Sequence, residues 1–518
     1  MAEVESVDAR TGNVRALVGV ETSPQQVDAI CLLAHEAFRK LHKRDRSWRA
    51  KLIRGMADSL AARREDIVAI ADAETGLGAD RIDGELTRTC FQLRMFAGVV
   101  EEGSFVEAII DHSGDTAMGP RPDLRRMLVP IGPVAVFGAS NFPLAFSVPG
   151  GDTAAALAAG CTVVVKAHES HPDTSRLCHA AMQEAAERLG APKGTIGIVY
   201  GRPAGSQLVQ HPSVSAVGFT GSVQGGRALM ALIEQRTQPI PFYGELGSVN
   251  PLVVSEGAAA ERAEEIGRGL ASSVTLGAGQ FCTKPGVAFV PSGADGDRVV
   301  SAAAEVIESQ PGTVMLNAGI TKSFAQGVNT LIRQHVVRRV ASGQMDGVAE
   351  DIPVAQLLEV HLDELTEGMV EECFGPIAIV VRYDGGAHLL AAIDKLPHSL
   401  TATLHTAADL TDVDESLRVA LESRCGRLVY NGFPTGVAVS WAQNHGGGWP
   451  ASNSLHTSVG ATAVRRFQRP LAWQNAPQEV LPVELRDETT DIIRRIDGTL
   501  QVPAVIAQLA QPDPREGT

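Results

Sequence analysis

Short apolar segments alternate with helical segments over much of the chain, and this alternation constrains the fold more than any other sequence feature. Val134–Phe137 and Thr162–Val165 are short apolar runs, and the small-residue stretch Gly151–Ala159 between them is typical of a helix. The pattern continues with a helix over Thr174–Leu189 and a strand over Gly197–Tyr200. Strands that alternate with helices pair side by side through right-handed crossovers. The sequence therefore predicts a parallel sheet covered by helices.

The first unit continues with a strand over Ser215–Phe219 and a helix from Gly225, and a second series of strands begins near Pro251, with NPLVV, GVAFV and PIAIVVRY. A chain of 518 residues is too long for one core and favours two or three domains. We expect one α/β domain over residues 1–250 and a second over residues 251–470. The polar remainder, residues 471 to 518, is expected to return to the first domain or to an interface between subunits.

Two N-terminal segments depart from the strand–helix alternation. The first hundred residues are predicted to be helical, and the apolar residues of Trp48–Arg64 recur at helical spacing. Glycine, proline and charged residues then cluster in the segment HSGDTAMGPRPDLRR. Such a cluster favours an irregular, exposed connection. We therefore expect an arm near residues 105–130.

Charge and cysteine content narrow the classes of function. The formal net charge of −15 argues against nucleic acid as the main partner, because phosphate binding needs clustered Lys and Arg. The seven cysteines are scattered and form no CxxC pair, which favours a reducing compartment and argues against a disulfide framework or a metal site. No apolar run of about 18 residues occurs, so we expect no membrane span and a cytoplasmic protein.

Two segments hold candidate catalytic residues. Cys282 lies in the turn GAGQFCTKP. A lone cysteine is usually a buried small apolar residue, but Gln280 and Lys284 beside it are polar. Partial exposure and an electropositive surrounding lower the pKa of a thiol, and this loop is expected to supply both. Glu245 lies in FYGELGSVNP just before an apolar strand, where confinement gives a carboxylate the raised pKa of a catalytic base.

Two other residues follow predicted strands directly. Asn141 in FGASNFP offers an amide NH2 to a developing oxyanion, although asparagine in a turn usually serves the turn's conformation. Lys166 ends the strand VVVK, and open α/β sheets bind ligands at the carboxyl ends of their strands. A solvated surface lysine is the alternative.

Two further segments suit a dinucleotide. GFTGSVQGG joins a strand to a helix start, an arrangement that can hold a diphosphate, although it is not GxGxxG. In EECFGP, Glu372 can bind a ribose diol and Phe374 can lie against a flat ring. The candidate residues in the first segment are Thr220, Gly221, Ser222 and Gly226.

In this order, the segments resemble the motifs of the aldehyde dehydrogenase superfamily. The matching motifs are SNFP, the strand end at Lys166, FTGS, ELGSVNP, GQFCTKPG and EECFGP, and they span roughly Trp48 to Pro470. The resemblance implies an α/β fold with a Rossmann-like NAD(P)-binding domain over residues 1–250, a second α/β catalytic domain over 251–470 and a small oligomerisation arm. It also implies a homodimer or a homotetramer.

The resemblance assigns a role to each catalytic candidate. Cys282 is the nucleophile that forms a thiohemiacetal and then a thioester. Asn141 stabilises the oxyanion, and Glu245 activates the water that releases a carboxylic acid. No metal takes part.

The resemblance further implies NAD or NADP as the cofactor. Glu169 favours NAD, because a carboxylate repels a 2′-phosphate, whereas Lys166 and Arg202 are placed near the same ribose and favour NADP. We therefore expect both cofactors to be used. The residues implied to contact the cofactor are Lys166, Glu169, Arg202, Thr220, Gly221, Ser222, Gly226, Leu246, Glu372 and Phe374.

Departures from the usual family motifs indicate which branch of the family the chain resembles. ELGSVN stands where ELGGK is frequent, and HGGGWPAS stands where PFGGxKxSG is frequent. Together with GASNFP and QFCTKPG, they resemble the branch of 2-oxoglutarate-semialdehyde (2,5-dioxovalerate) dehydrogenases and NADP-preferring fatty-aldehyde dehydrogenases. The substrate is then 2-oxoglutarate semialdehyde or, alternatively, a broad range of aldehydes or long-chain aldehydes. His445 of the HGG segment either assists Cys282 or contacts the substrate, or it is a structural turn residue.

Two rival functions remain on the same fold. In a CoA-acylating semialdehyde dehydrogenase, the thioester is transferred to CoA; such relatives usually lack the glutamate base, so Glu245 argues against this reading. A structural or cofactor-binding protein without activity predicts the loss of Cys282 or Glu245, and both are present.

Overall fold

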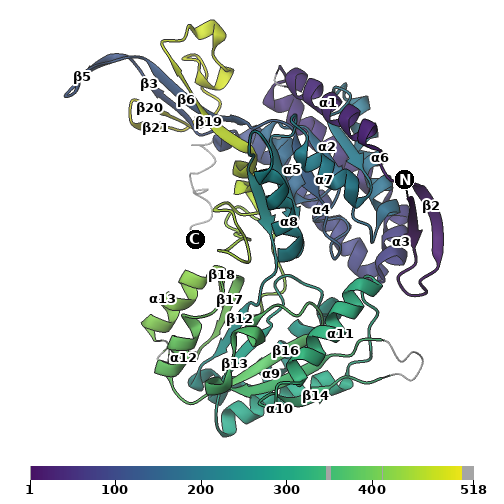
Figure 1. Cartoon of the computed structure of the whole chain (residues 1–518). Helices are drawn as coiled ribbons and strands as arrows, with labels where there is room; N and C mark the ends of the chain where they lie inside the picture. The colour runs from purple at the N-terminus through teal and green to yellow at the C-terminus, as the bar shows by residue number, and fades with distance from the viewer. Residues whose placement is uncertain (1, 42, 346–351, 411, 413, 504–518) are drawn as a thin grey trace, which may run out of the picture.

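The computed structural model describes residues 2–41, 43–345, 352–410, 412 and 414–503. The chain forms two α/β units, each built on its own sheet, and a third sheet that projects from the first unit (Figure 1). In Figure 1 the first unit is purple to teal and the second is green.

The first unit contains a five-stranded parallel sheet in the order β11-β10-β7-β8-β9. The four strands and three helices predicted for this unit are confirmed, with starts and ends that shift by at most two residues. The strands are β7 (Val134–Phe137), β8 (Val163–Lys166), β9 (Ile196–Val199), β10 (Ala216–Thr220) and β11 (Phe242–Glu245). The helices are α5 (Gly151–Ala159), α6 (Pro172–Arg188), α7 (Arg202–Gln210) and α8 (Val223–Glu234).

The strand order of this sheet places several predicted site residues at one edge. The strands β8 and β9 extend the sheet on one side of β7, whereas β10 and β11 extend it on the other side. At such a reversal the carboxyl ends of the strands open a crevice that binds ligands. Thr220 pairs with Glu245, and Phe137 pairs with Lys166. All four residues therefore lie at the carboxyl edge.

The second unit contains a seven-stranded sheet in the order β14-β15-β16-β13-β12-β17-β18, in which β14 alone is antiparallel to its neighbour. The predicted strands NPLVV, GVAFV and PIAIVVRY are confirmed as β12, β13 and β16. The strands are β12 (Pro251–Val254), β13 (Val287–Pro291), β14 (Arg338–Ser342), β15 (Gln356–His361), β16 (Ile377–Tyr383), β17 (Ser399–His405) and β18 (Cys425–Tyr430). The helices are α9 (Glu256–Thr275), α10 (Ala294–Ser309), α11 (Ala318–Ile332), α12 (Gly386–Ile393) and α13 (Glu415–Arg424).

The N-terminal region is helical only in part, so the expectation of helix throughout the first hundred residues is wrong. A β-hairpin comes first, formed by β1 (Glu3–Val7) and β2 (Val14–Val20). Nearly all of its side chains are exposed or half-buried, so the hairpin has little of the apolar alternation that marks a strand. The helices that follow are α1 (Pro24–Leu41), α2 (Arg46–Ala61), α3 (Arg64–Thr75) and α4 (Ala79–Glu102).

The segment expected as an irregular arm is built largely of strands. The arm forms the centre of a sheet in the order β19-β6-β3-β20-β21, and it carries a β4-β5 hairpin at its tip. The last strands of the chain complete this sheet, whereas residues 504–518 of the predicted tail lie outside the described residues. The strands are β3 (Ala108–Asp111), β4 (Gly114–Thr116), β5 (Gly119–Arg121), β6 (Leu124–Pro130), β19 (Gln468–Gln474), β20 (Arg494–Ile496) and β21 (Thr499–Gln501).

Candidate active site

A tight loop between α9 and β13 carries Cys282. Its backbone is left-handed at three consecutive residues, Gly277, Ala278 and Gly279. A Cβ atom on Gly279 would overlap the backbone of Gly375, so only glycine permits this approach. The close approach holds the Cys282 loop against the EECFGP loop.

Asn250 fixes the same loop from the other side, and sequence reasoning missed its role. Its Nδ2 donates to the carbonyl oxygens of Cys282 at 2.7 Å and Lys284 at 2.9 Å. Its Oδ1 accepts from Ser248 at 2.6 Å. The motif ELGSVNP contains both polar residues, and their position next to the candidate base was the available signal.

Asn141 lies against the Cys282 loop, as its predicted role requires. Its Nδ2 donates to the backbone carbonyl oxygen of Gln280 at 2.9 Å. The backbone carbonyl oxygen of Asn141 accepts from Arg81 at 2.8 Å. Asn141 is buried. The bond to Gln280 uses one of the two amide hydrogens and fixes the plane of the amide, so the second hydrogen is available to an oxyanion.

His445 reaches the sulfur of Cys282. The Nε2 atom lies 3.7 Å from Sγ, and the backbone N–H of His445 donates to Thr457 at 2.8 Å. Burial, together with the nearby charges of Arg427 and Arg88, lowers the pKa of His445 to about 3. The imidazole is therefore neutral over the physiological range, and its Nε2 can accept a hydrogen bond from the thiol.

The pKa of Cys282 is raised, so the expectation of a lowered pKa is wrong. The thiol is partly exposed, as expected. Burial, together with the carboxyl groups of Glu372 and Glu245, nevertheless raises its pKa to about 12. The nearest loop cation does not offset this, because Lys284 is buried and donates to the carbonyl oxygen of Ile377 at 2.7 Å. The resting form is the thiol.

Glu245 ends β11 and is 3 % exposed. Its Oε1 accepts from Ser452 at 3.3 Å, and its Oε2 is buried without a partner within the described residues. Burial raises the pKa of Glu245 well above its usual value, and a buried ion pair of Arg466 and Asp152 acts on it with opposing charges. A carboxylate with a raised pKa is a stronger proton acceptor once it is ionised.

Three predicted cofactor residues form one charged cluster. Lys166 at the end of β8 forms an ion pair with Glu169, and Arg202 at the start of α7 lies 3.9 Å from the same carboxylate oxygen. Lys166 is buried, and burial lowers its pKa. Arg202 is 89 % exposed. Both cations thus lie beside the acid whose charge disfavours a 2′-phosphate.

The helix α8 offers an open N-terminus to a diphosphate. Ser222 caps it by accepting from Gly225 at 3.1 Å, and its first turn carries no acidic residue. Gly221 and Ser222 are exposed. A Cβ on Gly226 would lie 2.7 Å from the side chain of Leu246, so α8 packs directly on the residue that follows Glu245. Backbone N–H groups at a helix N-terminus bind phosphate groups.

The remaining cofactor candidates lie in nearby segments. Thr220 ends β10, and the N–H of Gly221 donates to the carbonyl oxygen of Glu245 at 3.0 Å. The carboxylate of Glu372 lies directly over Gly247, because a Cβ on that glycine would overlap Oε2. Phe374 is half-buried in the same loop. Val223 of α8 also lies close to the position of a Cβ on Gly247, so α8 and the Glu372 loop meet at this glycine.

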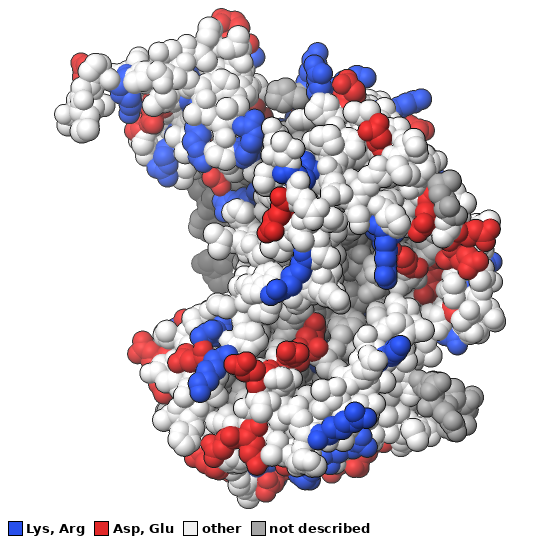
Figure 2. Space-filling view, viewed as in Figure 1, with Lys and Arg blue, Asp and Glu red and all other residues white. Residues whose placement is uncertain are grey.

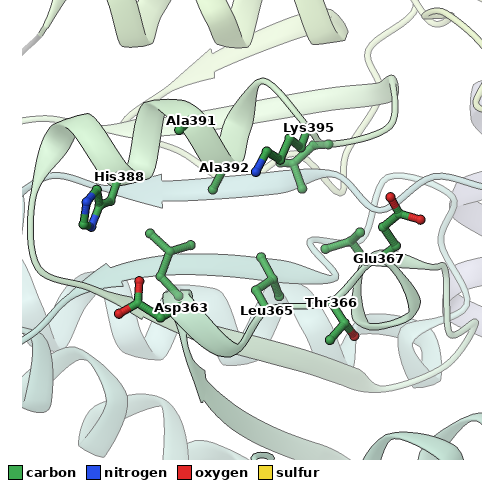
Figure 3. A pocket seen from close by; sticks show the side chains of 11 residues that line it. Asp363, Leu365, Thr366, Glu367, His388, Ala391, Ala392 and Lys395 are labelled. Atoms are coloured by element: carbon green, nitrogen blue, oxygen red, sulfur yellow. The ribbon is translucent and has the colours of Figure 1, made fainter.

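The cavity in Figure 3 is a separate feature of the second unit. It measures about 380 Å³ and lies between α12 and the short helices of residues 362–370. Figure 3 shows His388 and Lys395 on one side and Asp363 and Glu367 on the other. None of the predicted site residues lines it. The cavity is therefore distinct from the predicted site.

The described part of the chain contains neither a cluster of metal-binding side chains nor a membrane-spanning helix. It contains no group of three or more His, Cys, Asp or Glu side chains arranged to hold a metal ion. No helix in this part is long and apolar enough to cross a membrane. Figure 2 shows Lys and Arg interspersed with Asp and Glu over both units on the face in view.

Comparison with known proteins identifies the family. The model of the aldehyde dehydrogenase family matches residues 2–469. Alpha-ketoglutaric semialdehyde dehydrogenase 2 of Azospirillum brasilense is 42% identical over 502 residues, covering 95% of this chain and 94% of that protein. Alpha-ketoglutaric semialdehyde dehydrogenase of Acinetobacter baylyi is 40% identical over 506 residues, covering 96% and 95%.

Solved structures share the fold. The crystal structure of an NADP-dependent enzyme of E. coli has a TM-score of 0.78 at 22% identity and covers 92% of this chain and 95% of that chain. The resemblance, the α/β fold class and the expected use of NAD or NADP by an aldehyde dehydrogenase are thereby confirmed. The chain belongs to the aldehyde dehydrogenase family.

Proposed function

We propose that this enzyme oxidises 2-oxoglutarate semialdehyde to 2-oxoglutarate through a thioester on Cys282. The observation that carries the chemistry is the convergence of Cys282, Asn141 and Glu245 from three distant segments. The substrate is supported by the two relatives that are 42% and 40% identical over nearly the whole chain and are named for this semialdehyde.

The chain's own groups account for the first half of the reaction. The sulfur of Cys282 attacks the aldehyde carbon, a C–S bond forms, and the thiol proton passes to Nε2 of His445. The new oxyanion accepts hydrogen bonds from the Asn141 amide and the Cys282 N–H. Bound NAD or NADP supplies the nicotinamide that accepts a hydride, which leaves a thioester on the enzyme.

Glu245 accounts for the second half. Its carboxylate takes a proton from water, the resulting hydroxide attacks the thioester carbon, and the C–S bond breaks. The product leaves as a free carboxylic acid, and the thiolate of Cys282 recovers a proton. Because Glu245 lies on β11 and Cys282 on the loop before β13, the base is separate from the nucleophile.

The residues around the carboxyl edge of the first sheet fit a dinucleotide. Lys166 and Glu372 would hold the two riboses, and the N-terminus of α8 at Ser222 would hold the diphosphate. The fit rests on the open helix end and on the buried Lys166 at a strand terminus. Glu169 and Arg202 would lie at the adenosine 2′ position.

Glu169→Thr is expected to raise the ratio of kcat/KM with NADP to kcat/KM with NAD by roughly 10-fold or more. The variant removes the carboxylate that repels a 2′-phosphate and frees Lys166 and Arg202 to bind it. Steady-state kinetics with both cofactors measure the ratio. Glu184→Gln, which changes an exposed acid on α6, serves as the control. An unchanged ratio in Glu169→Thr would show that this carboxylate does not decide the preference.

His445→Ala is expected to lower kcat/KM for the aldehyde about 100-fold, because the thiol then lacks its nearest proton acceptor. In the parent enzyme, alkylation of Cys282 by iodoacetamide should accelerate about tenfold per pH unit up to pH 9, because the thiolate is the minor form below a pKa of about 12. Peptide mass spectrometry gives the alkylation rate. His388→Ala on α12 is the control for His445→Ala and should keep the parent kcat/KM. Parent-level turnover in His445→Ala would assign this histidine a structural role only.

A substrate panel tests the proposed function. The panel contains 2-oxoglutarate semialdehyde, succinate semialdehyde, a short and a long aliphatic aldehyde, each with NAD and NADP. The highest kcat/KM is expected for 2-oxoglutarate semialdehyde, with 2-oxoglutarate as the product. A higher value for the long aldehyde, or product formation only with added CoA, would overturn the assignment.

The proposal also covers the oligomeric state and the cellular location of the enzyme. We propose a homodimer or homotetramer whose contact includes the projecting sheet around β6, because that sheet extends from the body of the first unit. Light scattering of the purified protein measures the mass. A cytoplasmic location is supported by seven cysteines that are all unpaired.

A further inference from the structure

Two arginines from different units reach the region of Cys282. Arg88 lies on α4 and Arg427 on β18. The Nη2 atom of Arg88 lies 3.5 Å from the carbonyl oxygen of Val437, while Arg427 donates to the carbonyl oxygens of Gly436, at 2.8 Å, and Pro434. Both guanidinium groups thus contact one short loop, residues 434–437.

The contacts of Arg88 lead directly to the nucleophile. Its guanidinium lies over the ring of Phe146, 5.4 Å from the centroid, and that ring lies 6.1 Å from the ring of His445. His445 in turn contacts the sulfur of Cys282. Both arginines are also close enough to interact electrostatically with a thiolate on Cys282. Both cations therefore lie in the neighbourhood of the nucleophile.

Neither arginine has a carboxylate partner among the residues that the structure describes. The Nη1 atom of Arg88 and the Nε atom of Arg427 are buried without any hydrogen-bond partner there. Glu85, on the same helix, interacts electrostatically with Arg88 but forms no ion pair with it, because its Oε1 accepts from the backbone N–H groups of Leu144 and Ala145. Guanidinium nitrogen atoms that are buried without a hydrogen-bond partner are unfavourable, so such a site is suited to an anion that arrives from outside.

A third arginine, Arg81, serves a different purpose. It donates to the carbonyl oxygen of Asn141 and lies between the rings of Phe142 and Phe281, at 5.2 and 4.7 Å. These contacts hold the oxyanion donor and the residue before Cys282 in place. Arg81 is therefore a positioning residue.

We propose that Arg88, supported by Arg427, binds the carboxylate at the far end of the aldehyde substrate and so makes the enzyme selective for carboxylate-bearing aldehydes. The proposal rests on the proposed function and names the residues that select its substrate. A guanidinium presents parallel N–H donors that match the two oxygens of a carboxylate. The neighbouring Phe146 excludes water from one side of this contact and strengthens it.

The test compares matched substrates in Arg88→Met. We expect kcat/KM for 2-oxoglutarate semialdehyde and succinate semialdehyde to fall roughly 10- to 100-fold, mostly through KM, because charge-assisted hydrogen bonds are lost. For pentanal, which lacks the carboxylate, the change should stay within about threefold. Arg88→Lys keeps the positive charge but loses the paired N–H donors of the guanidinium. Its kcat/KM for the two semialdehydes should lie between the values of the parent and of Arg88→Met. Arg94→Met, on the exposed side of the same helix, is the control.

A second measurement covers the case in which Arg88→Met does not fold. Glutarate should inhibit pentanal oxidation competitively in the parent enzyme, and Arg88→Lys should weaken this inhibition. A parent enzyme without preference for carboxylate-bearing aldehydes would overturn the proposed substrate. A parent preference that survives in both Arg88 variants would overturn the assignment of Arg88 alone, and equal losses on charged and uncharged aldehydes would show a structural role.

Discussion

Cys282→Ser is expected to lower aldehyde oxidation by roughly 10⁴-fold or more, because a hydroxyl at this position replaces the sulfur that forms the covalent intermediate. A serine hydroxyl is a weaker acid than a thiol and its oxygen is a poorer nucleophile than sulfur, so the variant does not form the covalent intermediate at a comparable rate. The measurement is the rate of NAD(P)H formation under saturating aldehyde.

Two controls make the result specific to Cys282. Cys31→Ala, which changes a buried thiol on α1, should retain the parent rate. Alkylation of Cys282 in the parent enzyme should abolish activity, and saturating aldehyde should slow this inactivation. Turnover at the parent rate in Cys282→Ser would remove the covalent mechanism altogether.

Glu245→Gln is expected to separate the two halves of the reaction. Attack by Cys282 remains possible, whereas thioester hydrolysis loses its base, so kcat should fall by roughly 10²- to 10⁴-fold. Rapid mixing should show one equivalent of NAD(P)H per active site, followed by a stall. Intact-protein mass spectrometry should detect the acyl group on the enzyme.

Thioester hydrolysis is expected to become faster as the pH rises. Burial raises the pKa of Glu245, and only the ionised carboxylate accepts a proton, so the hydrolysis rate should rise with pH through a midpoint above 4.5. Glu245→Gln should lose this rise. Glu234→Gln at the exposed end of α8 is the matched control. Continuous turnover without a burst in Glu245→Gln would contradict the role of this residue.

The sequence by itself determined four of the five strands in the sheet of the first unit, three of the seven in the sheet of the second unit, and the order of the motifs. Val134–Phe137 and the neighbouring β-branched runs are buried on both faces, so their apolar character is continuous and easily read. The exposed hairpin of β1 and β2 lacks that signal, which explains why it was missed. Glycine-rich turns likewise marked the loops of Cys282 and Glu245, because left-handed backbone and close approach require glycine there.

Only the tertiary structure decided which distant residues surround the sulfur. The contact of His445 with Cys282, the raised pKa of that thiol, and the unpartnered cations of Arg88 and Arg427 depend on segments that lie more than a hundred residues apart. The pairing of β19 with β6 joins equally distant parts of the chain. A local pattern reports helix, strand or turn because those depend on neighbours, whereas burial and charge pairing depend on the whole packed chain.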